Sequence, residues 1–216
     1  MAVIKTLNSS QTQEKLPIRM SKQGWISSYE KQTIPHWAQR KNHSPLANEL
    51  VKVLNKRSGN KILEIGVGNG RDCKFFAQKN NQVTGIDIAP GALRLATQNC
   101  QAEICNGKVN LLLGDAENLE FSNSTFDAIY SLSVLHSTNL EKSLAEITRV
   151  LKPKGKALLY MYELVRTPTS KHTFWTAKQI KKLIRKNKLI IDDSWTTWEK
   201  GYKENTKIII LQIHKK

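Results

Sequence analysis

The chain has 216 residues, with 34 Lys and Arg against 18 Asp and Glu, so its formal charge at pH 7 is +16. This length suits one domain with a substantial hydrophobic core. The three cysteines form no Cys-x-x-Cys pair and have no His at ligand spacing, which argues against a disulfide framework and predicts no metal site. No apolar stretch reaches membrane-spanning length and residues 1–20 hold no signal-peptide core. We therefore expect a reduced, cytoplasmic protein with no membrane partner.

Much of the positive excess lies late in the chain. Residues 151–216 contain 16 Lys and Arg and 5 Asp and Glu. Such a surface attracts nucleic acid, anionic lipid or an acidic substrate. A solvated basic coat is the plainer explanation, because the charges are dispersed and no aromatic-interleaved RNA motif accompanies them.

Residues 1–43 differ in character from the rest of the chain. Residues 1–20 are polar and irregular, which predicts a loose arm. Residues 21–43 hold aromatic side chains in a polar context, among them Trp25, Tyr29 and Trp37. Aromatic groups in such a segment need a place to be buried, and a ligand site is the nearest concave surface. We interpret residues 1–43 as an arm followed by an aromatic lid segment.

Residues 44–216 have the pattern of one α/β domain. Ser44 and Pro45 are typical of a helix start. Strands and helices then alternate, which predicts a parallel sheet with right-handed crossovers. The expected strands cover residues 61–66, 82–88, 109–113, 126–132 and 156–162, and the expected helices cover about 72–79, 90–104 and 139–151, with a turn at 152–155.

The C-terminal part departs from this alternation. Thr176 and Gln179 match a capping box and predict a helix whose outward face is basic. Two strands follow, over residues 188–192 and 206–213, and the polar connection between them is too short for a crossover helix. We expect these two strands to be antiparallel neighbours.

The most informative stretch is Gly66-Val67-Gly68-Asn69-Gly70, which ends the first strand and opens a helix. Such a loop presents backbone N–H groups and a helix N-terminus to a ligand, and its glycines allow a close approach. The spacing matches neither the dinucleotide fingerprint nor the P-loop. Glu64 stands just before the loop; its carboxylate would repel a pyrophosphate but suits a ligand with a cationic end.

Further polar residues follow the next strands. Ligands of open α/β sheets bind beyond the carboxyl ends of the strands. There Asp87 can accept hydrogen bonds from two ribose hydroxyls, and Asp115 can accept from an exocyclic amine while the N–H of Ala116 donates to a ring nitrogen. Ser131 and His136 follow the fourth strand. Asp87 and Asp115 could be ordinary helix caps, which need no ligand. Their matching positions at the ends of successive strands favour a nucleoside site instead.

Five stretches resemble the class I S-adenosylmethionine-dependent methyltransferases, of the type 11 and type 25 kind. The resemblance implies a three-layer Rossmann-like α/β sandwich, with a seven-stranded, mainly parallel sheet whose last strand is antiparallel. It also implies S-adenosyl-L-methionine as the cofactor. The stretches are Leu63-Glu64-Ile65-Gly66-Val67-Gly68-Asn69-Gly70, Val83-Thr84-Gly85-Ile86-Asp87-Ile88-Ala89-Pro90, Gly114-Asp115-Ala116, Phe126-Asp127-Ala128-Ile129-Tyr130-Ser131 and Arg149-Val150-Leu151-Lys152-Pro153-Lys154-Gly155.

The resemblance assigns roles to individual residues. It implies that Gly66 and Gly68 approach the methionine part, that Asp87 holds the ribose, and that Ile88 packs on the adenine held by Asp115 and Ala116. The segment from Tyr29 to Pro35-His36-Trp37 loosely resembles the N-terminal cover of the thiopurine and tellurite-resistance enzymes, although His36 separates Pro35 from Trp37. The full set of expected cofactor residues is Glu64, Gly66, Gly68, Gly70, Asp87, Ile88, Asp115, Ala116, Ser131, Tyr29 and Trp37.

The expected reaction is in-line methyl transfer to an N, O or S atom of a small-molecule acceptor. His136 is the candidate base, because it follows the fourth strand, where acceptors lie in this family; a packing histidine is the alternative. Aromatic and acidic side chains that could line an acceptor pocket, as a roof, a cation–π cage or a carboxylate partner, are Trp25, Tyr162, Glu163, Trp175 and Trp198.

Other functions stay open from the sequence. An RNA methyltransferase would use the basic C-terminal half, but Ser131-Leu132-Ser133-Val134 replaces the Asn/Asp-Pro-Pro-Tyr/Phe run usual in enzymes that methylate base amines. A non-catalytic cofactor-binding partner is a second alternative, and aminopropyl transfer is a third. We expect a monomer or a homodimer.

Overall fold

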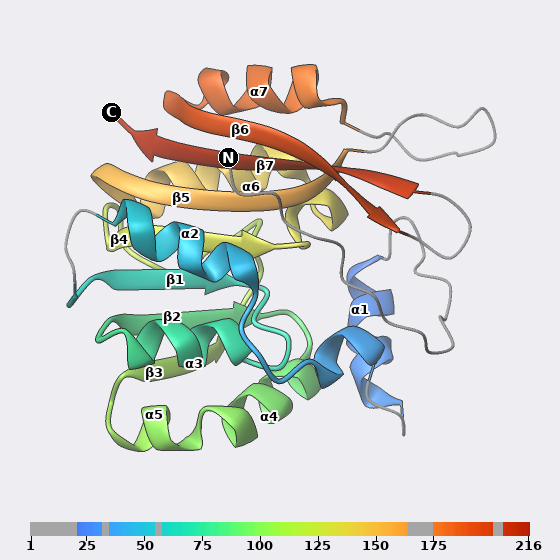
Figure 1. Cartoon of the computed structure of the whole chain (residues 1–216), viewed down its shortest axis with the longest axis vertical. Helices are drawn as coiled ribbons and strands as arrows, with labels where there is room; N and C mark the ends of the chain where they lie inside the picture. The colour runs from blue at the N-terminus through green and yellow to red at the C-terminus, as the bar shows by residue number, and fades with distance from the viewer. Residues whose placement is uncertain (1–20, 32–34, 55–57, 164–174, 201–204) are drawn as a thin grey trace.

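A computed structural model describes residues 21–31, 35–54, 58–163, 175–200 and 205–216 (Figure 1). For residues 36, 37, 199, 200, 205 and 206 it describes the backbone only. The expected N-terminal arm, residues 1–20, lies outside the described residues.

A single seven-stranded sheet forms the centre of the molecule, in the order β3-β2-β1-β4-β5-β7-β6. β1 to β5 are parallel neighbours, and β7 runs antiparallel to both β5 and β6. This confirms the predicted Rossmann-like α/β fold with its inserted antiparallel last strand. The strands are β1 (Lys61–Ile65), β2 (Gln82–Asp87), β3 (Val109–Leu113), β4 (Phe126–Leu132), β5 (Leu151–Glu163), β6 (Leu189–Lys200) and β7 (Asn205–Lys215).

Helices cover both faces of this sheet. On one face α6 and α7 bury their apolar sides, and on the other α2 to α5 do so. Successive strand residues alternate between the two layers, as the two-residue period of a strand requires: Ile62 faces α2 and α3, whereas Leu63 faces α6. The helices are α1 (Lys22–Glu30), α2 (Pro45–Val53), α3 (Arg71–Gln78), α4 (Pro90–Asn99), α5 (Gln101–Cys105), α6 (Leu140–Val150) and α7 (Ala177–Lys186), with short 3-10 turns η1 (His36–Gln39) and η2 (Leu135–Ser137).

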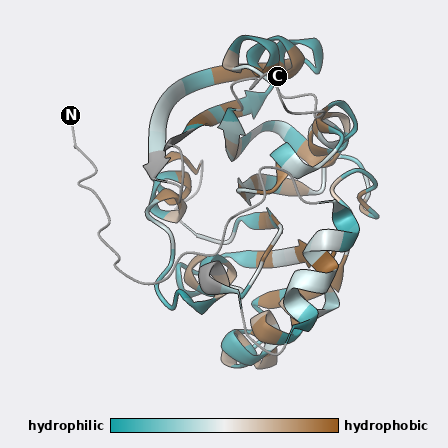
Figure 2. Cartoon of the chain, turned by 90° about the vertical axis from the view of Figure 1, so that its right-hand side faces the viewer, coloured by the Kyte–Doolittle hydropathy of each residue, from teal (hydrophilic) through white to brown (hydrophobic). Residues whose placement is uncertain are grey.

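Local signals explain why the helices begin where they do. The Ser44 hydroxyl accepts from the N–H of Ala47 at the start of α2, and Thr176 and Gln179 form the predicted capping box at the start of α7. In Figure 2 the helices beside the sheet each carry both apolar (brown) and polar (teal) residues, as amphipathic helices do.

Three predicted boundaries are wrong. The helix expected over residues 90–104 breaks at Cys100 into α4 and α5. The turn expected at 152–155 lies within β5, where the register against β4 shifts and Lys154 adopts a φ of 61°. β6 continues to Lys200, far beyond residue 192, because it pairs along β7. In each case pairing or packing with distant residues overrides the local signal.

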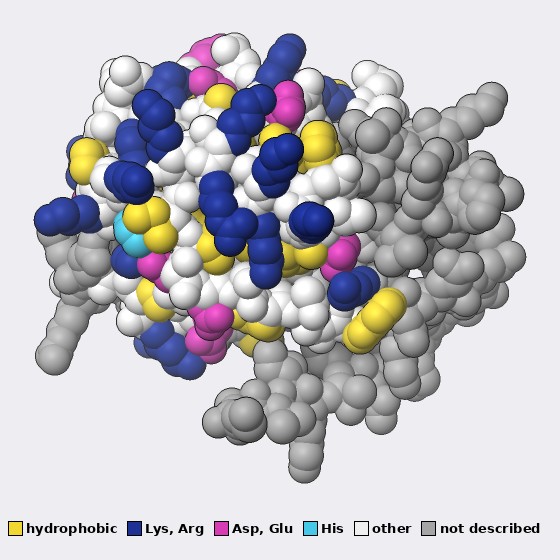
Figure 3. All heavy atoms as spheres, turned by 90° about the horizontal axis from the view of Figure 1, so that it is seen from above, with side chains coloured by type: hydrophobic (Ala, Val, Ile, Leu, Met, Phe, Trp, Pro, Cys, Tyr) yellow, Lys and Arg dark blue, Asp and Glu magenta, His cyan; other side chains and the backbone are white. Residues whose placement is uncertain are grey.

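The outer face of α7 is strongly basic. Its apolar residues Ile180, Leu183 and Ile184 are buried, and its cationic residues point away from them. Figure 3 views the molecule from the side of α7 and shows Lys and Arg side chains gathered over this face. Among the described residues, no helix is both long and apolar enough to cross a membrane.

Candidate functional site

The glycine loop leaves the carboxyl end of β1 and bends over the end of β2. Gly66 and Gly68 have φ values of 78° and 55°, in the left-handed region that favours glycine. The N–H of Gly66 donates to the carbonyl of Ile86 over 2.8 Å, and Gly70 provides the N-cap of α3. The loop therefore lies at the helix N-terminus, as the sequence predicts.

Gly66 also permits contact with the loop that follows β4. A Cβ at this position would stand 2.2 Å from Cγ2 of Val134, far closer than two carbon atoms can approach. The segment from Ser133 to His136 can therefore pack directly onto the glycine loop. This brings the chain after β4, with the candidate base, beside the loop after β1.

Asp87 stands at the end of β2, next to the glycine loop. Its Oδ2 accepts the N–H of Gly68 at 3.0 Å and its Oδ1 accepts the N–H of Ala89 at 2.9 Å. Burial raises the pKa of this carboxyl above its ordinary value, and the bonds from Ala89, Gly68 and Ile88 oppose that rise. The carboxylate thus fixes the loop relative to β2 and is itself held in one orientation.

Asp115 stands at the end of β3. Its Oδ1 accepts the N–H of Glu117 at 2.9 Å, and its Oδ2 accepts from the ammonium group of Lys22 at 2.6 Å. The same ammonium lies 3.0 Å from Oε1 of Glu117. Ala116 beside it is buried. Lys22 of α1 therefore donates a hydrogen bond to Asp115, the carboxylate that the sequence analysis assigns to an exocyclic amine of the ligand.

Glu64 is buried in the floor of the site, 3% exposed. No described residue offers its Oε2 a hydrogen bond, and the same holds for the hydroxyl of buried Ser131 on the neighbouring strand β4. Burial, with the nearby negative charge of Asp72, raises the pKa of Glu64 well above its ordinary value, and a bond from Cys73 opposes this. A buried acceptor with a free lone pair suits a cationic ligand group.

Helix α1 covers the carboxyl ends of β1 to β3 (Figure 1). Near its end, the hydroxyl of Tyr29 lies 3.3 Å from where a Cβ on Gly68 would stand, and its backbone packs against Gly91. Trp25 lies half-buried on the same helix. The side chain of Trp37, expected in the same cover, lies outside what the structure describes.

A second set of predicted residues meets at the ends of β4 and β5. The rings of His136 and Tyr162 contact each other edge to face, with centroids 4.4 Å apart. Tyr160 extends this aromatic group, 6.3 Å from Tyr162. His136 therefore lies two residues after Val134, the residue that meets Gly66, and has Tyr162 as its neighbour on the next strand.

The remaining predicted acceptor residues lie elsewhere. Oε1 of Glu163 accepts the N–H of Ala177, and its Oε2 lies 2.9 Å from the ammonium of Lys207, so this carboxylate fixes the start of α7. Trp175 packs against the core cluster under α6 and α7. Trp198 is 60% exposed on β6.

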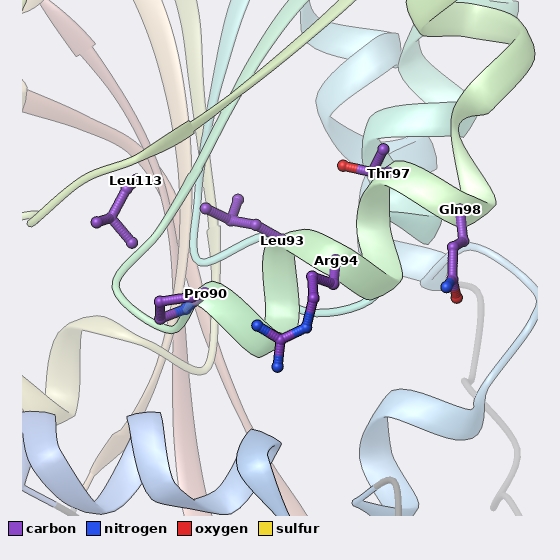
Figure 4. Close-up of a pocket in the computed structure, with 6 residues that line it drawn as sticks. All are labelled: Pro90, Leu93, Arg94, Thr97, Gln98 and Leu113. Atoms are coloured by element: carbon purple, nitrogen blue, oxygen red, sulfur yellow. The ribbon is translucent and has the colours of Figure 1, made fainter.

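An open depression lies on the outer side of α4, beside the edge strand β3 (Figure 4). Leu113, 64% exposed, faces it from the end of β3. None of the predicted site residues lines it. The residues around it are Pro90, Leu93, Arg94, Thr97, Gln98 and Leu113.

Sequence reasoning missed several residues that hold the site together. The side-chain amide of Asn69 donates to the carbonyls of Ala38 and Arg40, which anchors the N-terminal segment on the glycine loop. Arg149 of α6 donates to the carbonyls of Leu119 and Phe121, in the loop that follows Asp115. A polar residue within a glycine loop is a signal that could have found Asn69. For Lys22 no local signal exists, because its partners lie 93 and 95 residues away.

Comparison with known proteins agrees with this arrangement. Residues 63–159 match the family model of the methyltransferase domain. These residues form a class I S-adenosylmethionine-dependent methyltransferase domain. The matched segment holds the glycine loop, Asp87, Asp115 and the loop after β4; helix α1 lies outside it.

The curated relatives of this chain differ in the atom that their names specify. An O-methyltransferase of Aspergillus nomiae, rstn1, is 30% identical over 113 residues, which are 51% of this chain and 50% of the relative. The ubiquinone/menaquinone biosynthesis C-methyltransferase UbiE of Hydrogenovibrio crunogenus is 32% identical over 143 residues, 63% of this chain and 55% of the relative. The chain thus spans about half the length of these relatives.

Solved structures share the fold of this chain. The [4+2]-cyclase SpnF superimposes with a TM-score of 0.72 at 16% identity, over 94% of this chain and 99% of the cyclase. At that identity the likeness establishes the architecture alone.

Proposed function

We propose that this methyltransferase transfers a methyl group from S-adenosyl-L-methionine to a small-molecule acceptor. One observation carries the proposal: the ends of β1, β2 and β3 bring a glycine loop and two carboxylates to one edge, above a buried Glu64 that has an unused acceptor oxygen. An adenosyl group with a cationic amino-acid end fits these groups. Helix capping alone would account for the positions of Asp87 and Asp115. It does not account for the buried Oε2 of Glu64, to which no described residue donates a hydrogen bond.

The residues would divide the cofactor between them. Gly66 and Gly68 would pass its methionine part, with Glu64 below to balance positive charge. Asp87 would accept from the ribose hydroxyls through the lone pairs that Gly68 and Ala89 leave unused. Asp115 and Ala116 would hold the adenine edge, and Ile88 its face. Bound there, the cofactor would supply an activated methyl group on a sulfonium sulfur.

The chain's own contribution to the reaction is orientation, exclusion of water and removal of one proton. The glycine loop after β1 and the residues after β4 would align an electron pair of the acceptor with the methyl group that the cofactor supplies. Where the acceptor atom carries a proton, His136 would take it. α1 with Tyr29 would exclude water from above, and Tyr162 would pack beside the acceptor.

The acceptor atom is a matter of proposal. The names of the relatives include O- and C-methyltransferases, so carbon joins the N, O and S atoms expected from the sequence. The aromatic pair of His136 and Tyr162 favours a planar or apolar acceptor over a charged one. Glu163 is held by Lys207 and α7, which disfavours it as the partner of a cationic amine.

The basic face of α7 favours a second candidate, methylation of RNA. Five cations occupy one ten-residue helix that has no acidic residue. RNA bound there would lose affinity steeply with salt.

The test is a paired assay. Titration calorimetry with S-adenosylhomocysteine should give saturable binding to the full chain, and radiolabelled methyl transfer should then be measured to a metabolite panel and to total RNA. Label in a metabolite fraction supports the proposal. Binding without transfer to either would favour the non-catalytic alternative, and label confined to RNA would favour the second candidate.

A further inference from the structure

Helix α1 is held at both ends over the site. At its first residue, Lys22 bonds to Asp115 at the end of β3; in its last turn, Tyr29 packs against Gly68 and Gly91, which follow β1 and β2. Lys22 and Tyr29 are separated by about 10 Å at the usual helical rise. Two strand spacings amount to about the same length. One helix therefore reaches from the glycine loop to the end of the edge strand of the sheet.

The contact at Lys22 is electrostatic. Its ammonium lies 2.6 Å from Oδ2 of Asp115 and 3.0 Å from Oε1 of Glu117. Burial lowers the pKa of Lys22, but the bonds to the two carboxylates outweigh this and leave it above its ordinary value, so the group is charged at neutral pH. The side chains of Lys22 and Asp115 are 40% and 33% exposed, which leaves the pair open to screening by salt.

The same contact uses the acceptor that the proposed function assigns to adenine. Oδ1 of Asp115 accepts from the backbone of Glu117, and Oδ2 accepts from Lys22. An adenine amine that donates to Oδ2 shares this oxygen with the ammonium and so weakens its bond to Lys22. Glu117 offers Lys22 a second partner, because its carboxylate already lies within ion-pair distance.

We propose that Lys22 is a latch that holds α1 over the cofactor site, and that the adenine amine of the cofactor displaces the Lys22 ammonium from Asp115 onto Glu117. This inference rests on the proposed cofactor function. Lys22 is a positioning residue in this scheme, and the rate at which the ligand enters depends on release of the latch.

Stopped-flow binding of S-adenosylhomocysteine to the full chain tests the latch, because this ligand has no net charge and is little affected by steering. Lys22→Ala should raise the association rate constant by roughly threefold to tenfold, the range that two partly exposed ion pairs allow. Glu117→Gln, which leaves Asp115 intact, should raise it by a smaller factor. Lys31→Ala removes an exposed charge at the end of the same helix and should change nothing.

Salt supplies an independent readout. Raising the salt concentration from 50 to 500 mM should accelerate association in the wild type and have little effect on Lys22→Ala. An association rate of Lys22→Ala equal to or below that of the wild type, or a wild-type rate independent of salt, would overturn the latch. Equilibrium binding separates the two claims: ligand that binds at unchanged rates refutes the latch alone, whereas absence of binding in every variant refutes the cofactor site.

Discussion

The backbone N–H of Gly68 donates a 3.0 Å hydrogen bond to the carboxylate of Asp87. This bond joins the glycine loop after β1 to the end of β2, so the groups proposed for the methionine part and the ribose are positioned together. A change at Asp87 therefore acts on ligand binding in two ways, through the lost acceptor and through the released loop.

Asp87→Ala should weaken the binding of S-adenosylhomocysteine by about 1.5–3 kcal/mol, the scale of hydrogen bonds to a charged group. Titration calorimetry measures this directly. Asp193→Ala is the matched control, because Asp193 is exposed on β6, where it accepts the adjacent backbone N–H of Ser194. Equal affinities in the wild type and Asp87→Ala would remove Asp87 from the ribose role.

Gly66→Ala should destabilise the fold through backbone strain and through contact with Val134. Gly59→Ala isolates the strain, since Gly59 has a similar φ of 76° and no atom of the described residues beyond its chain neighbours lies within 4 Å of its Cβ position. We expect about 1–2 kcal/mol for Gly59→Ala and roughly 1–3 kcal/mol more for Gly66→Ala. Chemical denaturation gives both values.

Truncation of Val134 completes a double-mutant cycle at this contact. In the presence of Val134→Ala, the cost of Gly66→Ala should fall towards that of Gly59→Ala, because the methyl group that it meets is gone. Additive costs would show that the loop after β4 does not press on the glycine loop.

Glu64→Gln should change the pH dependence of stability. The folded pKa of Glu64 lies well above its unfolded value near 4.5, so between these two values the folded state binds the extra proton and stability falls as pH rises. The variant has no such group. Its melting temperature relative to that of the wild type should therefore increase from pH 5 to pH 8.5.

Melting curves of both proteins across this range provide the measurement. Asp72 and Asp87, whose charges act on Glu64, are present in both proteins and largely cancel in the difference. If the difference in melting temperature between Glu64→Gln and the wild type stays constant with pH, the folded state does not raise the pKa of Glu64. The affinity of the variant for S-adenosylhomocysteine should also be lower.

His136→Ala should slow methyl transfer by about 10²- to 10⁴-fold if His136 removes the acceptor proton, while affinity for S-adenosylhomocysteine changes little. For each variant, the rate of methyl transfer to the acceptor found in the metabolite panel is measured beside the calorimetric affinity for S-adenosylhomocysteine. His214→Ala serves as control, because His214 pairs with Asp192 on β6, apart from the proposed site residues. Equal losses of binding and transfer would instead indicate a packing role for His136.

The sequence alone determined the fold class, the antiparallel last strand and the motif positions at the ends of β1, β2 and β3. These features depend on local signals: two-residue and 3.6-residue periodicity, caps, and glycines beside acidic residues at the ends of strands. Such signals involve residues close together in the sequence, so they can be recognised without knowledge of the tertiary structure.

Only the tertiary structure decided how the site is closed and which groups are engaged. The bond of Lys22 to Asp115, the contact of Gly66 with Val134 and the pairing of Glu163 with Lys207 each join segments far apart in the chain. Their formation depends on side chains that meet after the sheet has assembled, and the same packing decides where β6 ends. The periodicity or spacing within one segment cannot predict these side-chain contacts, because they depend on how whole helices and strands are positioned relative to one another.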